Sequence, residues 1–232
     1  MVDTPVGPRG LGAIFDPDER DQRFPATAIP TISEAKERGW RYWWGQGLWG
    51  DQGMTPQCVS YALLHAVADG PTTHTESTPK MAFEDLYCLA KKRDPWPGNC
   101  DEGPQYDGTS VRAGIKVLRD QGYVDHFRWA SSLDEVVKTI LVHGPVVAGT
   151  LWTQGMSHPD SEGHIHATGD LDEVHSAHAY VINGVNVDRE VFRVKNSWGR
   201  SWGLRGFAWL PFEDFEELIK EYAELCVPVW SE

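Results

Sequence analysis

The sequence predicts an α+β fold with two lobes. Helical periodicity dominates between residues 57 and 143, and runs rich in β-branched and aromatic residues follow from Pro145 onward. Because helices come first and strands second, the two kinds of element are expected to segregate rather than alternate. The length of 232 residues is sufficient for one large domain with its own core.

The first 32 residues are expected to form an extended arm that lies on the body of the protein. Pro, Asp and Arg are frequent there, and proline and glycine interrupt both helix and strand. Phe15, Phe24 and Ile29 are the candidate anchors of this arm. A short helix is expected in SEAKERGWRYWW, residues 33–44, with Ser33 as its cap.

Four further helices are predicted before the strands begin. The first, QCVSYALLHAVAD, carries apolar residues at a helical period over three turns, which indicates a buried helix. The other helices are expected at 80–93, 109–121 and 132–143, and strands at 145–150, 177–185, 191–195 and 206–210. The tail, residues 212–225, is a final helix candidate. We therefore expect a mainly helical lobe over 33–143 and a mainly β lobe over 144–232, within one domain.

Charge and composition exclude several classes of protein. The formal net charge is -13, which disfavours nucleic acid as a partner. No run approaches the ~18 consecutive apolar residues of a membrane span. The N-terminus lacks the basic-then-apolar pattern of a signal peptide. A cytoplasmic or virion-associated protein is expected, and removal of an export signal stays open as the alternative. Four cysteines are too few for a disulfide scaffold.

Cys58 opens the buried helix. The free N–H groups at a helix N-terminus favour a thiolate, which is the nucleophilic form of cysteine. An inert core cysteine is the alternative reading of this residue alone. A cysteine nucleophile needs a base and a third group that orients the base. His178, in a strand-like run, and Asn196, in the run KNSWGR, lie downstream in the order that such a site requires.

Three segments together resemble the papain family of cysteine peptidases (C1-type, clan CA). DQGMTPQC resembles the nucleophile segment, with Gln52 six residues before Cys58, HAYVINGV resembles the base strand, and VKNSWGRSWGLRGF resembles the Asn segment. DGTSVR and DPDERDQRF are similar to the divergent bacterial and phage branch. The resemblance implies a papain-like fold, in which a cleft separates a helical lobe from a β-barrel-like lobe.

The resemblance also implies a role for each matching residue. Cys58 is expected to be the nucleophile, held as a thiolate beside an imidazolium, and His178 the base and then the acid. Asn196 is expected to orient His178, and Gln52 to donate to the oxyanion together with the Cys58 backbone N–H. His175 is the rival base. The substrate-binding residues are expected to be Gly108, Thr109, Ala177 and Trp198.

The resemblance implies a thiol peptidase that hydrolyses peptide bonds through an S-acyl intermediate. Its partners would be peptide or protein substrates, with no cofactor and no metal. An amidase or transpeptidase with the same triad is one alternative. A catalytically silent papain-fold protein, such as a component of a particle, is another. The stretch that contains His164, His166 and His175 allows a divalent metal site, although a polar loop beside the cleft is favoured.

The sequence also departs from the family pattern. Thr55 stands where the family has a disulfide cysteine, and the expected partner near Gln105 is absent too, which is coherent with a reducing compartment. Cys88 and Cys100 are expected to be free thiols, with a bridge between them as the alternative. The residues before the first helix are too few for the family's inhibitory propeptide. Control would then come from the compartment, a partner or the N-terminal arm.

Overall fold

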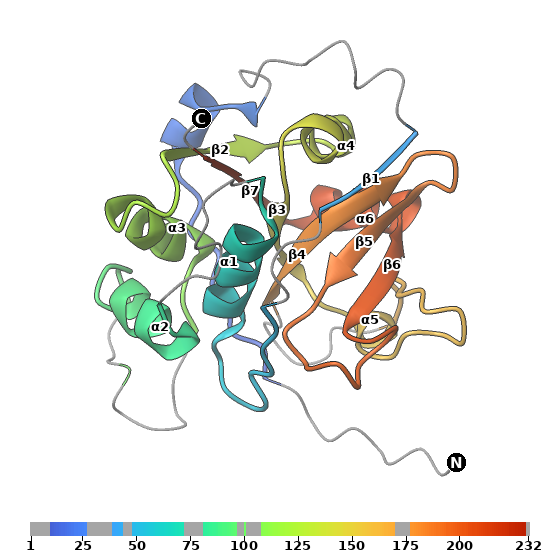
Figure 1. Ribbon diagram of the computed structural model, residues 1–232, viewed down its shortest axis with the longest axis horizontal. Helices are drawn as coiled ribbons and strands as arrows, with labels where there is room; N and C mark the ends of the chain where they lie inside the picture. The colour runs from blue at the N-terminus through green and yellow to red at the C-terminus, as the bar shows by residue number, and fades with distance from the viewer. Residues whose placement is uncertain are drawn as a thin grey trace.

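The computed structural model describes residues 10–26, 39–43, 48–71, 81–96, 100, 108–169 and 177–230. Within these ranges, seven strands form one open antiparallel sheet, in the order β2-β7-β3-β4-β5-β6, with β1 paired to β4 (Figure 1). The strands are β1 (Trp40–Tyr42), β2 (His126–Ala130), β3 (Val146–Leu151), β4 (Ala177–Asn186), β5 (Val191–Lys195), β6 (Phe207–Pro211) and β7 (Ala223–Val229).

Helices pack against both faces of this sheet. They are η1 (Glu19–Arg23), α1 (Cys58–Asp69), α2 (Phe83–Lys91), α3 (Val111–Asp120), α4 (Leu133–Val142), α5 (Gln154–Ser157) and α6 (Phe212–Glu221). Figure 1 shows α1, α2 and α3 together at one side of the molecule, with β5 and β6 at the other. The combination of helices with an antiparallel sheet confirms the α+β class. The sheet is open, so it fits the expected barrel-like lobe only loosely.

The sheet separates two hydrophobic cores. Successive side chains of a strand point to opposite faces, and β4 follows this rule. Ala179 and Val181 pack into the core that contains α1, α2 and α3. Tyr180 and Ile182 pack into the core beneath α4 and α6. β4 is thereby fixed between two packed layers, and its first residues reach the N-terminal end of α1.

Several predicted elements need correction. The helix expected at 33–44 is wrong at Trp40–Tyr42, which is strand β1; residues 33–38 lie outside the described residues. The tail helix ends at Glu221, and Ala223–Val229 is strand β7 between β2 and β3. Strand β2 was not predicted. Strands β1 and β2 come from the range assigned to the helical lobe, and the division of the chain at residues 32 and 143 stays a prediction.

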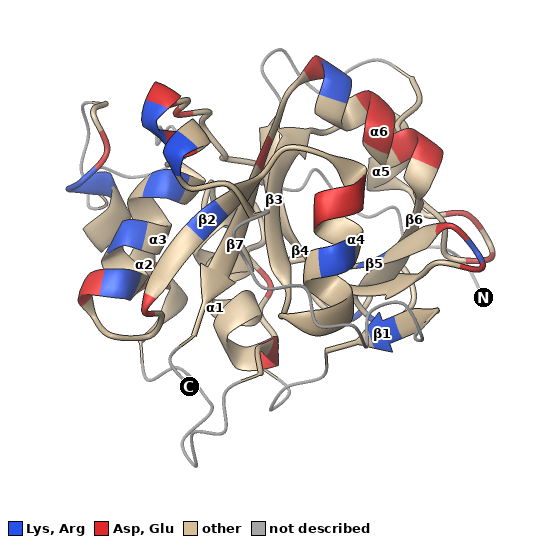
Figure 2. Ribbon diagram, turned by 90° about the horizontal axis from the view of Figure 1, so that it is seen from above, with Lys and Arg blue, Asp and Glu red and all other residues tan. Residues whose placement is uncertain are grey.

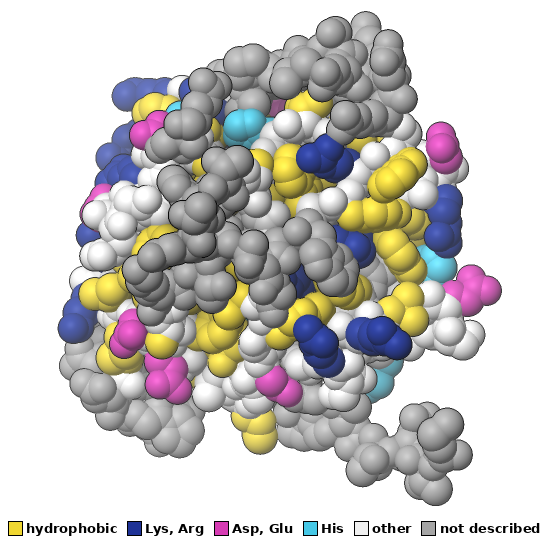
Figure 3. Space-filling model, viewed as in Figure 1, with side chains coloured by type: hydrophobic (Ala, Val, Ile, Leu, Met, Phe, Trp, Pro, Cys, Tyr) yellow, Lys and Arg dark blue, Asp and Glu magenta, His cyan; other side chains and the backbone are white. Residues whose placement is uncertain are grey.

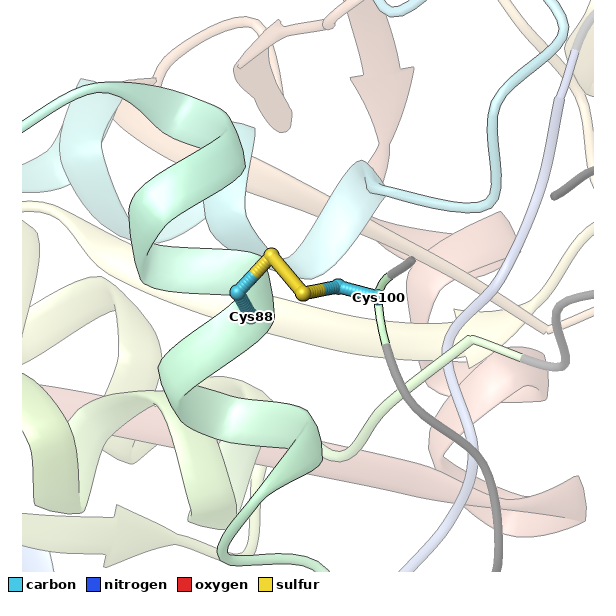
Figure 4. The surroundings of a disulfide bond; sticks show 2 residues. All are labelled: Cys88 and Cys100. Atoms are coloured by element: carbon cyan, nitrogen blue, oxygen red, sulfur yellow. A yellow bond between two sulfur atoms is a disulfide. The ribbon is translucent and has the colours of Figure 1, made fainter. Parts of the chain in front are cut away.

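Cys88 and Cys100 form a disulfide, so the expectation of two free thiols is wrong. Cys88 lies on α2, and its Cα atom lies 5.0 Å from that of Cys100 (Figure 4). A Cα separation of this size is within the range that a disulfide spans. Cys58 and Cys226 are free and buried.

The charges of the described residues are unevenly distributed. Figure 2 shows acidic residues along α6, whereas α3 and β2 carry Lys and Arg. On the face seen in Figure 3, hydrophobic side chains are interspersed with charged ones. Attraction of a charged substrate depends on the field near its site rather than on the total charge. No helix among the described residues is long and apolar enough to cross a membrane.

Candidate active site

His178 and Asn196 meet where β4 begins and β5 ends. His178 Nε2 lies 2.8 Å from Asn196 Oδ1, and both side chains are fully buried. The backbone N–H of Ser197 also donates to this Oδ1, at 2.7 Å. Because a backbone N–H only donates, the shared acceptor must be the oxygen of the Asn196 amide, and His178 Nε2 must carry its hydrogen. In a neutral ring, this arrangement leaves His178 Nδ1 with a free lone pair.

His178 Nδ1 is the nitrogen of the ring that can accept a proton. Among the described residues, His178 Nδ1 is buried without a hydrogen-bond partner. A buried polar atom without a partner is rare and often marks a functional group. His178 Nδ1 can therefore accept a proton from a donor that enters or reorients within the site.

Cys58 is the first residue of α1 and lies against β4. Its Sγ accepts a hydrogen bond from the backbone N–H of Ala179 at 3.4 Å, and its side chain is fully buried. Ala179 directly follows His178. Packing of α1 on β4 therefore places the thiol beside the histidine's strand, although the two are far apart in the sequence.

Burial dominates the electrostatics of both groups. It raises the pKa of Cys58 to about 12, although nearby backbone N–H groups act in the opposite direction. It lowers the pKa of His178 to about 4, and the hydrogen bond to Asn196 opposes this shift. Both directions favour the neutral forms. The expected thiolate and imidazolium stay a prediction, which burial of the two groups opposes.

Gln52 and Asn196 are linked through Ser197. The Ser197 hydroxyl donates to Gln52 Oε1, which turns the Gln52 Nε2 amide toward residue 10. Gln52 Nε2 donates to the carbonyl oxygens of Gly10, at 2.9 Å, and Thr55, at 2.7 Å. Ser197 thus helps to orient two of the predicted site residues. Ser197 was not among the predicted site residues, although it stands inside the KNSWG run that singled out Asn196.

Tryptophan rings surround His178. The ring of Trp198 lies 5.1 Å from the His178 ring, centroid to centroid, and Trp152 lies 4.6 Å away in an edge-on arrangement. Trp152 and Trp198 are almost fully buried. Both indole rings therefore pack next to the imidazole of His178. Trp152 was missed in the sequence analysis, because it follows β3 in a run with no recognisable motif.

The predicted substrate-binding residues all contact residues 10–14 of the same chain. We call this stretch the cleft segment. Thr109 N–H donates to the carbonyl of Gly12 at 2.9 Å, and Ala177 carbonyl accepts from Gly12 N–H at 3.4 Å. Trp198 Nε1 donates to the Gly10 carbonyl at 3.3 Å. The cleft segment therefore touches both the side of α1 and α3 and the side of the sheet.

Of the arm's three expected anchors, one packs as predicted. The ring of Phe15 lies 4.0 Å from that of Tyr222. Phe24 is 54% exposed and does not anchor the arm. Ile29 lies outside the described residues.

The described part of the histidine-rich stretch is tied to α6. His166 Nδ1 lies 2.9 Å from Asp214 Oδ2. The His164 and His166 rings are stacked 6.3 Å apart. Among the described residues, no three His, Cys, Asp or Glu side chains gather as a metal site. His175, the rival to His178, lies outside the described residues.

Comparison with known proteins assigns this fold and site to a class. Residues 80–221 match the family described as papain family cysteine protease, a range that contains His178 and Asn196 but begins after Cys58. Because this family match covers more than half of the sequence, it assigns the protein to the class of cysteine proteases. The chain belongs to the papain family.

Individual relatives are distant. An uncharacterized peptidase C1-like protein of Acanthamoeba polyphaga mimivirus is 23% identical over 206 residues, which cover 70% of this chain and 64% of the viral protein. A cathepsin B-like cysteine proteinase 3 of Ostertagia ostertagi is 24% identical over 154 residues, 63% of this chain and 86% of that protein. The chain thus spans less than two thirds of the viral relative's length.

Solved structures agree on the fold. Xylellain, a cysteine protease from Xylella fastidiosa, superposes with a TM-score of 0.69 at 18% identity over 100% of both chains. At this identity the likeness concerns the fold alone. It confirms the papain-like fold that the sequence predicted.

Proposed function

We propose that this chain hydrolyses peptide bonds with Cys58 as nucleophile and His178 as base and acid. The observation that carries the proposal is the fixed ring of His178. Its Nε2–H is held by Asn196, and its Nδ1 has no hydrogen-bond partner among the residues that the structure describes. This is the arrangement that a base needs when it must take a proton from a thiol.

The first half of the reaction forms the S-acyl intermediate. The Cys58 thiol transfers its proton to His178 Nδ1, and the thiolate attacks the carbonyl carbon of the substrate. A C–S bond forms, and the carbonyl oxygen becomes an oxyanion. Gln52 Nε2 and the backbone N–H of Cys58 donate to this oxygen. His178 then protonates the amine nitrogen, the C–N bond breaks, and the amine product leaves.

The second half releases the acid product. Water transfers a proton to His178 Nδ1 and attacks the thioester carbon. The C–S bond breaks, and the sulfur leaves as a thiolate that recovers the proton from the ring. Asn196 holds the imidazole plane through both halves, and Trp152 and Trp198 keep water from the Nε2 hydrogen bond.

The direct test is digestion of a mixture of unfolded peptides, with new termini identified by mass spectrometry. The full chain is used at high concentration, because its own residues 10–14 contact the predicted substrate-binding residues. A Gly12→Ala chain, in which the segment's fit is disturbed, is run in parallel. We expect new termini from at least one of the two. The same termini from Cys58→Ala chains, or none from either enzyme, would contradict the proposal.

Asn196→Ala is expected to lower kcat more than it raises KM. The amide contacts the ring of His178 and leaves substrate contacts to other residues. General acid–base catalysis contributes about 10²–10⁴-fold, and loss of ring orientation is expected to remove about 10- to 100-fold of it. Steady-state kinetics separate the two constants. Asn196→Asp retains an acceptor for Nε2 and should recover part of kcat. A change confined to KM would contradict the orienting role.

A further inference from the structure

A cavity lies between η1, α3 and β2, and Cys58 and His178 are not among the residues that line it. Its volume is about 560 Å³, within the range of about 300–1,000 Å³ that is usual for ligand pockets. Five Lys and Arg residues line it with only two Asp, whereas acidic residues outnumber basic ones by 34 to 21 in the whole chain. We call it the basic cavity; its lining includes Lys116, Arg119, His126, Phe127, Arg128 and Trp129.

Two elements direct positive charge into the basic cavity. On α3, Arg112, Lys116 and Arg119 are spaced by four and then three residues, so they lie on the same side of the helix. Like charges at this spacing repel each other and weaken a helix. On β2, His126 and Arg128 are two residues apart and therefore share a face of the strand. Helix and strand thus gather cations at one place (Figure 2).

Part of this positive charge has no carboxylate partner. The ion pairs at the cavity are Arg20–Asp18, Arg112–Asp21 and Arg119–Asp120. Within the part of the chain that the structure describes, Lys116 and Arg128 form no ion pair. An anionic group bound at the cavity would be attracted by both of these cations and would offset their repulsion.

Aromatic side chains form another part of the wall. Phe24 is 54% exposed although it is apolar. Phe127 packs edge-on against Trp129, with 6.0 Å between the ring centroids. A free inorganic anion would leave these apolar surfaces in water, whereas a ligand with both negative charge and an apolar side chain covers them as well. The basic cavity therefore suits an acidic peptide segment with an apolar residue better than a free anion.

The chain itself shows that this surface binds such a segment. Residues 16–24 read DPDERDQRF, an acidic stretch that ends in a phenylalanine. Arg112 Nη1 donates to Asp21 Oδ1 at 2.6 Å. The backbone N–H of Trp129 donates to the Phe24 carbonyl at 3.0 Å. These contacts within one chain support a second acidic segment as the ligand of the cations that have no partner.

We propose that the basic cavity binds an acidic segment of a protein substrate and so selects among substrates. The link to hydrolysis rests on the proposed function. Electrostatic complementarity of this kind favours the correct partner and speeds its encounter, and salt weakens it. The protein would then prefer substrates with acidic segments, although its own net charge of -13 disfavours them.

The position of the basic cavity along α3 predicts where the acidic residues of the substrate lie. Ser110 caps α3 and directly follows Thr109, a predicted substrate-binding residue. A helix rises about 1.5 Å per residue, so Lys116 and Arg119 lie about 9 and 14 Å from Ser110 along the axis. An extended peptide covers this distance in about three to four residues. Acidic residues are therefore expected at least that far from the substrate residue that contacts Thr109.

The first test is binding of a fluorescein-labelled peptide of Glu residues with one Phe, measured by fluorescence anisotropy. The Cys58→Ala chain is used, so that the probe is not cleaved. Lys116→Glu combined with Arg128→Glu should weaken binding at least about tenfold, because repulsion replaces attraction. Lys138→Glu combined with Lys220→Glu is the matched control, since it changes the net charge equally at exposed lysines of α4 and α6. The control should retain the affinity of the Cys58→Ala chain.

The apolar wall is tested with Phe24→Ala and with a second probe that has Gly in place of Phe. Phe24→Ala should weaken binding of the Phe probe about three- to tenfold and leave binding of the Gly probe unchanged. Equal affinity of the Lys116→Glu, Arg128→Glu variant and its background, or an equal loss in the control, would overturn the proposal. Lys116→Gln with Arg128→Gln repeats the test if thermal unfolding shows that the first variant is not folded.

Competition distinguishes a peptide from a phosphate ligand. Unlabelled peptide should displace the probe at a lower concentration than tripolyphosphate does. The reverse order would assign the basic cavity to phosphate and overturn the proposal.

Hydrolysis is measured separately, with two peptides that differ only in Glu or Gln within the acidic segment. KM should be about tenfold lower for the Glu peptide, and Lys116→Glu with Arg128→Glu should remove this preference without a change in kcat. Probe binding without hydrolysis in any chain supports the cavity and contradicts the peptidase. Hydrolysis without probe binding does the reverse. Probe binding and hydrolysis without a difference in KM would separate the cavity from the substrate and overturn the proposal.

Discussion

Replacement of Cys58 by alanine is expected to abolish peptide hydrolysis and leave the protein folded. The proposed reaction forms its only covalent bond to the enzyme at this sulfur, and loss of a nucleophile costs on the order of 10⁵–10⁶-fold in kcat. The substitution removes one buried sulfur atom, so we expect a fall in Tm of only a few degrees. Turnover is measured in the parent and in the Gly12→Ala chain, and Tm by thermal unfolding.

Cys226→Ala is the matched control for this experiment. Cys226 is also a free, fully buried cysteine, but it lies on β7. Replacement of Cys226 should lower Tm by a similar amount and leave turnover unchanged. If Cys58→Ala retains turnover, or if folded Cys226→Ala loses it, the nucleophile is misassigned.

The local sequence pattern was sufficient to predict secondary structure where the packing of a segment agrees with the spacing of its apolar residues. The helix Cys58–Asp69 begins one residue after the predicted segment QCVSYALLHAVAD and ends with it, and the strand Val191–Lys195 has the predicted bounds. Both are buried over most of their length, so their patterns are strong. The order of helices and strands, and with it the α+β class, followed from these signals.

Local pattern failed where a distant partner decides the conformation. Residues 212–225 read as one amphipathic helix, yet Ala223–Val229 pairs with β2 and β3. Pairing in the middle of a sheet overrides a weak helical preference. Trp40–Tyr42 likewise becomes a strand because it pairs with the last residues of β4, which extend beyond the part of β4 that pairs with β3.

The candidate site could be predicted from the sequence only where particular side chains form a recognisable motif. Sequence motifs identified four site residues: Gln52, Cys58, His178 and Asn196. The structure places Cys58 next to the strand of His178. It also links Gln52 with Asn196 through Ser197. The contacts of the cleft segment are made by backbone N–H and carbonyl groups, which every residue type possesses. Gly10, Gly12 and Gly108 were visible in the sequence, but their mutual approach depends on the fold.

Burial accounts for the difference between the charge states expected from the sequence and the directions of the pKa shifts. A thiol at a helix N-terminus is expected to favour the thiolate. In the structure, desolvation by burial is the first cause of the pKa shift of both Cys58 and His178, and it favours the neutral form of each group.

Asp69→Ala is expected to be the most destabilising single substitution proposed here. Asp69 ends α1, and Lys195 Nζ lies 2.9 Å from its Oδ1, with side chains only 4% and 2% exposed. Asn183 Nδ2 donates to Asp69 Oδ2 at 2.8 Å. Removal of one partner leaves a buried charge uncompensated, which costs about 3–5 kcal/mol. For a domain of this size, Tm should fall by about 6–20 °C.

Two further variants make this expectation specific to the buried pair. Asp134→Ala removes the exposed Asp134–Lys138 pair on α4, with side chains 68% and 50% exposed, and should cost less than about 1 kcal/mol. Asp69→Leu combined with Lys195→Met removes both buried charges and should recover most of the loss. A cost below about 1 kcal/mol for Asp69→Ala in urea unfolding, or no recovery in the double variant, would contradict the argument.

The buried pair also connects the two halves of the candidate site. Asp69 and Cys58 are the opposite ends of α1, and Lys195 directly precedes Asn196. Loss of the ion pair is therefore expected to loosen the seating of α1 on the sheet and the position of Asn196. We expect Asp69→Ala to lower kcat at a temperature at which the protein is still folded, and the double variant to recover kcat together with Tm. Recovery of Tm without kcat would assign the pair to stability alone.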